Sequence, residues 1–272
     1  MSGAAILPPL LLLGGGKMGS AMLAGWRERG ILRVVVVDPG PQATSLADEH
    51  VVVVASADAI PTNFAPKAII LAVKPQVAAE AVAPLRRFAG SAAIVSIMAG
   101  KTIAWLEARF GANAAVIRAM PNTPAAVRMG ITVAFAGPRV APGQKLLAEA
   151  LLGAVGEVAF VADEALLDPV TAVSGGGPAY VFLLVEMLEQ AAIEQGIPPD
   201  LAQKLARQTV IGSGALLAAS RESAEALRRA VTSPNGTTER ALAVLMEPSA
   251  WPEAMSKAIA AATTRSRELA KG

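Results

Sequence analysis

A glycine-rich segment near the start of the chain restricts the fold more than any other feature. Residues 14–19 read GGGKMG and fit the pattern G-x-G-x-x-G, directly after the apolar run LLLL at residues 10–13. A strand before this pattern and a helix after it are the context in which it binds a dinucleotide. In that context Gly14 permits the tight turn, Gly16 lets the backbone approach a pyrophosphate, and Gly19 lets the helix pack closely on the strand.

The first part of the chain continues in the same way, alternating short apolar runs with helical stretches. Several runs are apolar on both faces, which is typical of a parallel sheet covered by helices. We therefore predict an α/β Rossmann domain over residues 1–162, with a doubly wound, mainly parallel sheet. The expected strands are residues 10–13, 33–37, 51–54, 68–73, 93–97, 115–118 and 131–136, and the expected helices include residues 20–29, 75–88 and 103–110.

From Asp163 onward the pattern becomes entirely helical, and Asp163 itself is a suitable N-cap. We predict an all-α domain over residues 163–272, with helices at residues 164–173, 178–195, 199–219, 222–230, 237–246 and 251–270. The stretch 178–195 is apolar around nearly its whole circumference, so it must be buried on all sides. A second subunit is the expected cover, and we predict a homodimer formed through this domain.

Composition excludes several classes of function. The chain has no cysteine and a single histidine, His50, so no thiolate or multi-histidine metal site is expected. Lys and Arg are scattered, the formal net charge is +2 and aromatic residues make up 4%, which argues against a nucleic-acid surface. The N-terminal stretch has no basic residue before its apolar run, and Pro8 and Pro9 interrupt it, so a signal peptide is not expected. We expect a soluble, cytoplasmic protein that does not enter a membrane.

The cofactor expected from the glycine pattern is NAD(P)H, with NADH favoured. Asp38 follows Gly19 by nineteen residues and ends the second expected strand, where an acidic residue binds the adenosine ribose hydroxyls. The carboxylate would repel a 2′-phosphate, and residues 39–45 contain no arginine to bind one. A turn that binds no ligand is the alternative interpretation of the Asp-Pro-Gly sequence.

Two further loops follow expected strands and face the same crevice. The stretch AVKP at residues 72–75 turns from a strand into a helix, and a surface lysine is the alternative interpretation of Lys74. The stretch IRAMPNTPAAV at residues 117–127 holds two prolines that stiffen it. Such a rigid loop suits a wall beside a nicotinamide ring.

A hydroxyl-rich turn interrupts the helices of the second domain. Residues 233–238 read SPNGTT and precede a helix whose first N–H groups lack intrahelical partners. Such a terminus attracts an anion, and the hydroxyls of Ser233, Thr237 and Thr238 add donors around a carboxylate. The alternative is an ordinary N-cap, in which one hydroxyl serves the helix.

In this order, these stretches resemble pyrroline-5-carboxylate reductase. The resemblance implies reduction of 1-pyrroline-5-carboxylate to L-proline, the last step of proline biosynthesis, with NAD(P)H as hydride donor. It also implies a helical domain interlocked between two subunits, often with higher assembly. The matching stretches are residues 14–19, 72–75, 118–124, 174–180 and 231–238, the last with Asn235 where the family usually has glycine.

The dinucleotide pattern, the chemistry of the turn and the resemblance together give the expected residues of the site. Thr238 is expected to be catalytic, through a hydrogen bond to the ring nitrogen of the substrate. The expected substrate-binding residues are Glu164, Ser233, Gly236, Thr237 and Thr238. The expected cofactor-binding residues are Gly14, Gly16, Lys17, Met18, Gly19, Asp38, Ala72, Val73, Lys74, Pro75 and Asn122.

Two other functions remain open at the level of sequence. A β-hydroxyacid dehydrogenase also joins a Rossmann domain to a helical one, but it uses a lysine in the first long helix of the helical domain. No lysine lies between Lys145 and Lys204. A non-catalytic NAD(P)-sensing dimer would leave the hydroxyl-rich turn without a purpose. An imine substrate fits the absence of an evident acid, because a protonated C=N is neutralised when the hydride arrives.

Overall fold

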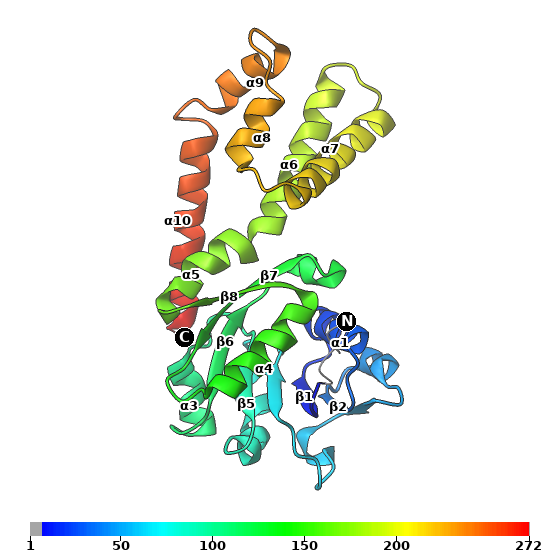
Figure 1. Ribbon diagram of the computed structural model, residues 1–272, viewed down its shortest axis with the longest axis vertical. Helices are drawn as coiled ribbons and strands as arrows, with labels where there is room; N and C mark the ends of the chain where they lie inside the picture. The colour runs from blue at the N-terminus through cyan, green and yellow to red at the C-terminus, as the bar shows by residue number, and fades with distance from the viewer. Residues whose placement is uncertain (1–6, 272) are drawn as a thin grey trace. The chain divides into compact units, whose positions relative to one another are not determined.

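The structure, a computed structural model, describes residues 7–271 and consists of two compact units (Figure 1). The first unit runs to Gly175 and takes in the end of the chain from Ala262, and the second comprises Gly176–Ala261. Residues 1–6, which open the predicted Rossmann domain, lie outside the described part. The predicted domain boundary after residue 162 lies where strands give way to helices, whereas the two compact units divide after Gly175. The predicted boundary stays a prediction.

An eight-stranded sheet forms the centre of the first unit, in the order β3-β2-β1-β4-β5-β6-β7-β8. The first six strands are parallel, β7 is antiparallel to β6, and β8 is parallel to β7. The predicted doubly wound, mainly parallel sheet is confirmed. The strands are β1 (Leu10–Leu13), β2 (Val34–Val37), β3 (Val51–Val54), β4 (Ala68–Leu71), β5 (Ala93–Ser96), β6 (Val116–Met120), β7 (Gly130–Ala136) and β8 (Gly156–Val161).

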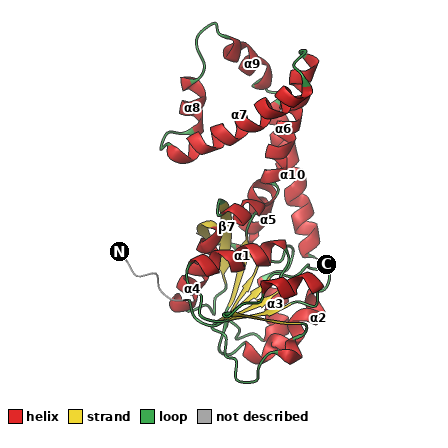
Figure 2. Cartoon of the chain, turned by 90° about the vertical axis from the view of Figure 1, so that its right-hand side faces the viewer, coloured by secondary structure: helices red, strands yellow, loops and turns green. Residues whose placement is uncertain are grey.

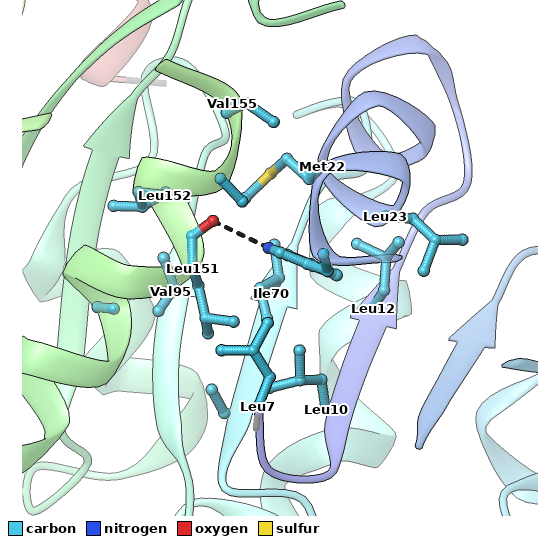
Figure 3. Packing of buried hydrophobic residues seen from close by; sticks show 14 of the residues in the cluster. Leu7, Leu10, Leu12, Met22, Leu23, Ile70, Val95, Leu151, Leu152 and Val155 are labelled. Atoms are coloured by element: carbon cyan, nitrogen blue, oxygen red, sulfur yellow. Dashed lines mark hydrogen bonds between the residues drawn. The ribbon is translucent and has the colours of Figure 1, made fainter. Parts of the chain in front are cut away.

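Helices cover both faces of this sheet (Figure 2). The helices are α1 (Lys17–Glu28), α2 (Ala78–Val82), α3 (Ile103–Phe110) and α4 (Pro142–Leu152). Successive leucines of β1 point to opposite cores: Leu10 and Leu12 pack with α1 and α4, and Leu11 and Leu13 pack with α2 and α3. In the first core the indole N–H of fully buried Trp26 donates to the carbonyl oxygen of Leu151 at 2.9 Å, which links α1 to α4 (Figure 3).

The segment after β8 is irregular where a single helix over residues 164–173 was predicted. A 3₁₀ turn (Glu164–Leu166), a short α5 (Leu167–Val170) and a π-helical turn (Thr171–Gly175) follow one another. The predicted N-cap is confirmed, because the carboxylate of Asp163 accepts a hydrogen bond from Ala165 N at 2.9 Å.

The second unit contains the predicted helices with small shifts at their ends. They are α6 (Gly177–Glu194), α7 (Pro199–Ala219), α8 (Ala224–Ala230), α9 (Thr237–Leu245) and the greater part of α10 (Trp251–Ala270). Of residues 176–261, all of which the structure describes, only Ala202 and Ala206 are buried within the chain. The second unit therefore has almost no core of its own. By length and composition alone, residues 164–194 could cross a membrane.

Candidate active site

The glycine loop between β1 and α1 has the conformation that its sequence demands. Gly14 has φ +99°, in the left-handed region, and a Cβ there would lie 2.7 Å from the carbonyl oxygen of Ala72 and 3.1 Å from Val73 Cγ1. Only glycine fits this close approach. The fold thus brings the first predicted cofactor loop directly against Ala72 and Val73, which belong to the second.

The other two glycines of the pattern differ in the space around them. A Cβ on Gly19 would collide with the carbonyl oxygen of Gly14, so Gly19 allows the helix to approach the strand closely. A Cβ on Gly16 would meet nothing within 4 Å, and Gly16 is the exposed N-cap residue of α1. Neither a side-chain cap nor an acidic residue occupies the first turn of α1. The loop therefore offers an open approach to free helix N–H groups, which fits a pyrophosphate.

Asp38 lies against the glycine loop. Its Oδ2 accepts a hydrogen bond from Gly15 N at 2.6 Å, and its Oδ1 accepts one from Gly40 N at 2.7 Å. The carboxylate thereby ties the end of β2 to the turn between β1 and α1. Each carboxylate oxygen has a further lone pair, so ribose hydroxyls can still be bound.

The remaining predicted cofactor residues lie at the ends of strands and at the start of α1. Lys17 is exposed at the first position of α1, and Met18 is partly buried against the core. Lys74 is exposed and Pro75 partly buried after β4. The side-chain oxygen of Asn122 accepts a hydrogen bond from Ile131 N at 2.9 Å, which fixes the loop between β6 and β7.

A salt bridge holds the same loop to α1. Arg128 has φ 62° at the end of the 3₁₀ turn Thr123–Val127, and its guanidinium binds both carboxylate oxygens of Glu28, at 2.7 and 2.9 Å. The hydrogen bonds from Arg128 lower the pKa of Glu28, and the same contact raises the pKa of Arg128. Elsewhere on the surface, burial raises the pKa of Asp48, but hydrogen bonds from His50 N and Arg27 outweigh it and leave that pKa lowered.

Glu164 lies in the first unit and forms an ion pair that the sequence reasoning missed. Its Oε1 accepts hydrogen bonds from Arg118 Nη1 at 3.0 Å and from Ile103 N at 2.9 Å. The side chain of Arg118 is only 3% exposed and that of Glu164 is 26% exposed. The signal that could have identified Arg118 is a single charged residue inside the buried strand VIRAM.

The hydroxyl-rich turn lies in the second unit. Asn235 has φ 58°, a left-handed conformation that asparagine tolerates better than other non-glycine residues. Its N–H donates to Glu239 Oε2 at 2.9 Å, and Gly236 N donates to the carbonyl oxygen of Ser233 at 3.0 Å. The turn therefore forms with asparagine at the position where a glycine would be usual.

The hydroxyl groups of this turn are available to a ligand. The N-cap residue of α9 is Gly236, so no side-chain hydroxyl caps the helix. Ser233, Thr237 and Thr238 are exposed, and their hydroxyls make no hydrogen bond within the part of the chain that the structure describes. The alternative interpretation, a hydroxyl N-cap, does not hold.

Two family models match the chain in succession. The model described as NADP oxidoreductase, coenzyme F420-dependent, matches residues 10–100. The model described as pyrroline-5-carboxylate reductase dimerisation matches residues 164–269. The second match covers the helical elements from the Glu164 turn through nearly all of α10, including the hydroxyl-rich turn.

Similar proteins of known name extend over nearly the whole chain. Pyrroline-5-carboxylate reductase of Pseudomonas aeruginosa is 37% identical over 97% of both chains, and that of Synechocystis is 39% identical over 96% of this chain and 97% of the relative. Among solved structures, a pyrroline-5-carboxylate reductase from Coxiella burnetii superposes with a TM-score of 0.90 at 32% identity, covering 97% of this chain and 99% of the other. The Plasmodium falciparum pyrroline carboxylate reductase, solved with NADP bound, gives a TM-score of 0.80 at 26% identity, covering 97% and 98%.

Proposed function

This chain belongs to the pyrroline-5-carboxylate reductase family, an NAD(P)H-dependent family that makes proline, and we propose that it reduces 1-pyrroline-5-carboxylate to L-proline. The observation that carries the proposal is the turn before α9, where three hydroxyls and the helix N-terminus are left free by the protein itself. A carboxylate-bearing substrate matches these donors.

The cofactor is proposed to lie on the glycine loop of the first unit. Gly14, Gly16 and Gly19, with Lys17 and Met18, would hold the pyrophosphate at the N-terminus of α1. Residues 72–75 (Ala72, Val73, Lys74 and Pro75) and Asn122 would line the nicotinamide half. NAD(P)H supplies the hydride when it is bound. NADH is the proposed preference, because Asp38 would repel a 2′-phosphate and no arginine lies in residues 39–45.

The substrate is proposed to lie at the hydroxyl-rich turn. Ser233, Thr237 and Thr238 would hold its carboxylate through their hydroxyls and the free N–H groups of the helix start, with Gly236 forming the turn that presents them and Glu164 also contributing to the substrate site. The Thr238 hydroxyl would bind the ring nitrogen. Because hydride addition to a protonated imine neutralises the ring, the chain needs no dedicated acid to stabilise an alkoxide. Its contribution to rate is then mainly to hold and orient the reactant.

The proposed assembly is a homodimer formed through residues 163–272, with higher assembly of dimers also proposed. The second unit leaves large apolar side chains of α6 more than a third exposed, including Val181, Phe182, Leu183, Met187 and Leu188. A second subunit would bury this surface, and we propose that the protein is soluble and cytoplasmic. The family model described as dimerisation, which matches residues 164–269, supports the proposed dimer.

The decisive assay follows NADH oxidation by the purified protein with 1-pyrroline-5-carboxylate. We expect turnover that depends on the substrate and yields L-proline in equal amount to the NADH consumed. Parallel reactions with NAD⁺ and 3-hydroxyacids should show no turnover. Activity with hydroxyacids alone would identify a hydroxyacid dehydrogenase, and binding of NADH without turnover of either substrate would identify a sensor.

A further inference from the structure

The guanidinium of Arg118 is buried with most of its hydrogen-bond donors unused. Its neighbours on β6 are Val, Ile, Ala and Met, and all five residues of the strand are buried. Nη1 donates to Glu164 Oε1, but Nε and Nη2 have no hydrogen-bond partner within residues 7–271. Burying a charged group with unsatisfied donors is unfavourable. This arrangement therefore requires a reason other than the filling of a core.

Stability alone would favour a different solution at this position. Replacing a buried ion pair by apolar residues of similar volume is often neutral or stabilising. Apolar residues already occupy positions near Arg118: Val116 lies on the same face of β6, and Phe135 of β7 pairs with Arg118, whereas the partner on β5 is Ser96. A pair that adds little to stability but has one defined geometry is suited to fixing the relative positions of the elements that it joins.

The pair joins three elements at one oxygen atom. Glu164 Oε1 binds Arg118 on β6 and also Ile103 N, which is the first residue of α3. Glu164 itself opens the 3₁₀ turn after β8. Strand β6 ends at Met120, only two residues after Arg118, and the chain then enters the loop that contains Asn122. The ion pair therefore lies next to the point at which this loop leaves the sheet.

We propose that Arg118 is a positioning residue for the reduction, acting through Glu164. The ion pair fixes the end of β6 and the start of α3, and so fixes the loop at Asn122 that is proposed to face the nicotinamide. The inference rests on the proposed reductase function. It assigns Arg118 no contact with the substrate or the cofactor.

The test removes both charges together, so that no unpaired charge remains buried. In the double variant R118M/E164Q, the glutamine keeps an oxygen for Ile103 N while the link to β6 is lost. We expect a melting temperature close to that of the wild type and a kcat lower by about 10- to 100-fold, since a small misplacement of a reactant has that effect. Because Glu164 is itself proposed to contribute to the substrate site, the KM for 1-pyrroline-5-carboxylate is compared with that of E164Q alone, and adding R118M should leave this KM unchanged. A primary isotope effect measured with 4-deuterated NADH should increase, because hydride transfer becomes slower.

Two matched variants separate positioning from general damage. R118K keeps the charge and a donor for Glu164, and should recover most of the lost kcat. R27M/D48N removes the ion pair between Arg27 and Asp48, which are 2.5 Å apart and about one-third exposed, and should leave kcat unchanged.

Each outcome of the test decides the question. A folded R118M/E164Q protein with wild-type kcat would overturn the positioning role, as would a KM raised above that of E164Q at unchanged kcat. If the double variant does not fold, R118M alone decides, since Glu164 is 26% exposed and still accepts from Ile103 N; a folded R118M protein of full kcat would count against the proposal. An inactive wild-type protein would overturn the reductase function and the inference with it. An active wild type with an equally active double variant would overturn the inference alone.

Discussion

At the scale of single residues, Thr238 carries the sharpest prediction about the reaction. Its hydroxyl is exposed and makes no hydrogen bond within the described chain, so its removal leaves no buried group unsatisfied. We expect Thr238→Ala to lower kcat/KM, because the loss of a hydrogen bond to the substrate removes about 1–3 kcal/mol of transition-state stabilisation. Thr238→Ser, which keeps the hydroxyl, should retain most of the activity. Steady-state kinetics, NADH titration and thermal melting of both variants would show whether activity alone changes. Loss of stability at full activity would contradict the assignment.

At the scale of secondary-structure elements, the contact of Asp38 with the glycine loop leads to a prediction about the cofactor. We expect kcat/KM to be higher with NADH than with NADPH. In Asp38→Asn one oxygen becomes an NH₂ group that faces a backbone N–H of Gly15 or Gly40, which costs about 1–3 kcal/mol for an unsatisfied group. The KM for NADH should therefore rise and its advantage over NADPH should shrink. A tenfold preference of the wild type for NADPH would show that Asp38 only supports the loop.

The elements also show how far the sequence determines the fold. Strands β1 to β7 were predicted, most of them because short runs apolar on both faces are typical of a covered parallel sheet. Strand β8 was missed because its sequence GEVAFV neither alternates polar and apolar residues nor forms a continuous β-branched run. The predicted helix over residues 75–88 is instead α2 followed by a 3₁₀ helix, because Pro84 removes an N–H near the start of the latter. Such breaks depend on local backbone chemistry that hydrophobic periodicity does not record.

The candidate site was predictable to the extent that it is local. The glycine loop depends on six consecutive residues, and the conformation of Gly14 follows from their spacing. The ion pair of Arg118 with Glu164 joins residues 46 apart in the chain, and only the packed structure brings them together. Asp38 is intermediate: its place after β2 was predictable, but its hydrogen bond to Gly15 N was not.

At the scale of the whole molecule, we expect the second unit to associate with another subunit, because its surface exposes large apolar side chains. Helix α6 has no buried residue within the chain, and Leu183 is 53% exposed on it. If a partner subunit covers this helix, Leu183→Asp places an unpaired charge in an apolar interface, which costs more than burying a neutral polar group there. We expect sedimentation to show monomer or aggregate, together with a lower melting temperature. Leu146→Asp is the matched control, since Leu146 is 66% exposed on α4 in the first unit and should leave the dimer intact. A folded Leu183→Asp dimer of unchanged stability would mean that α6 does not form the subunit interface.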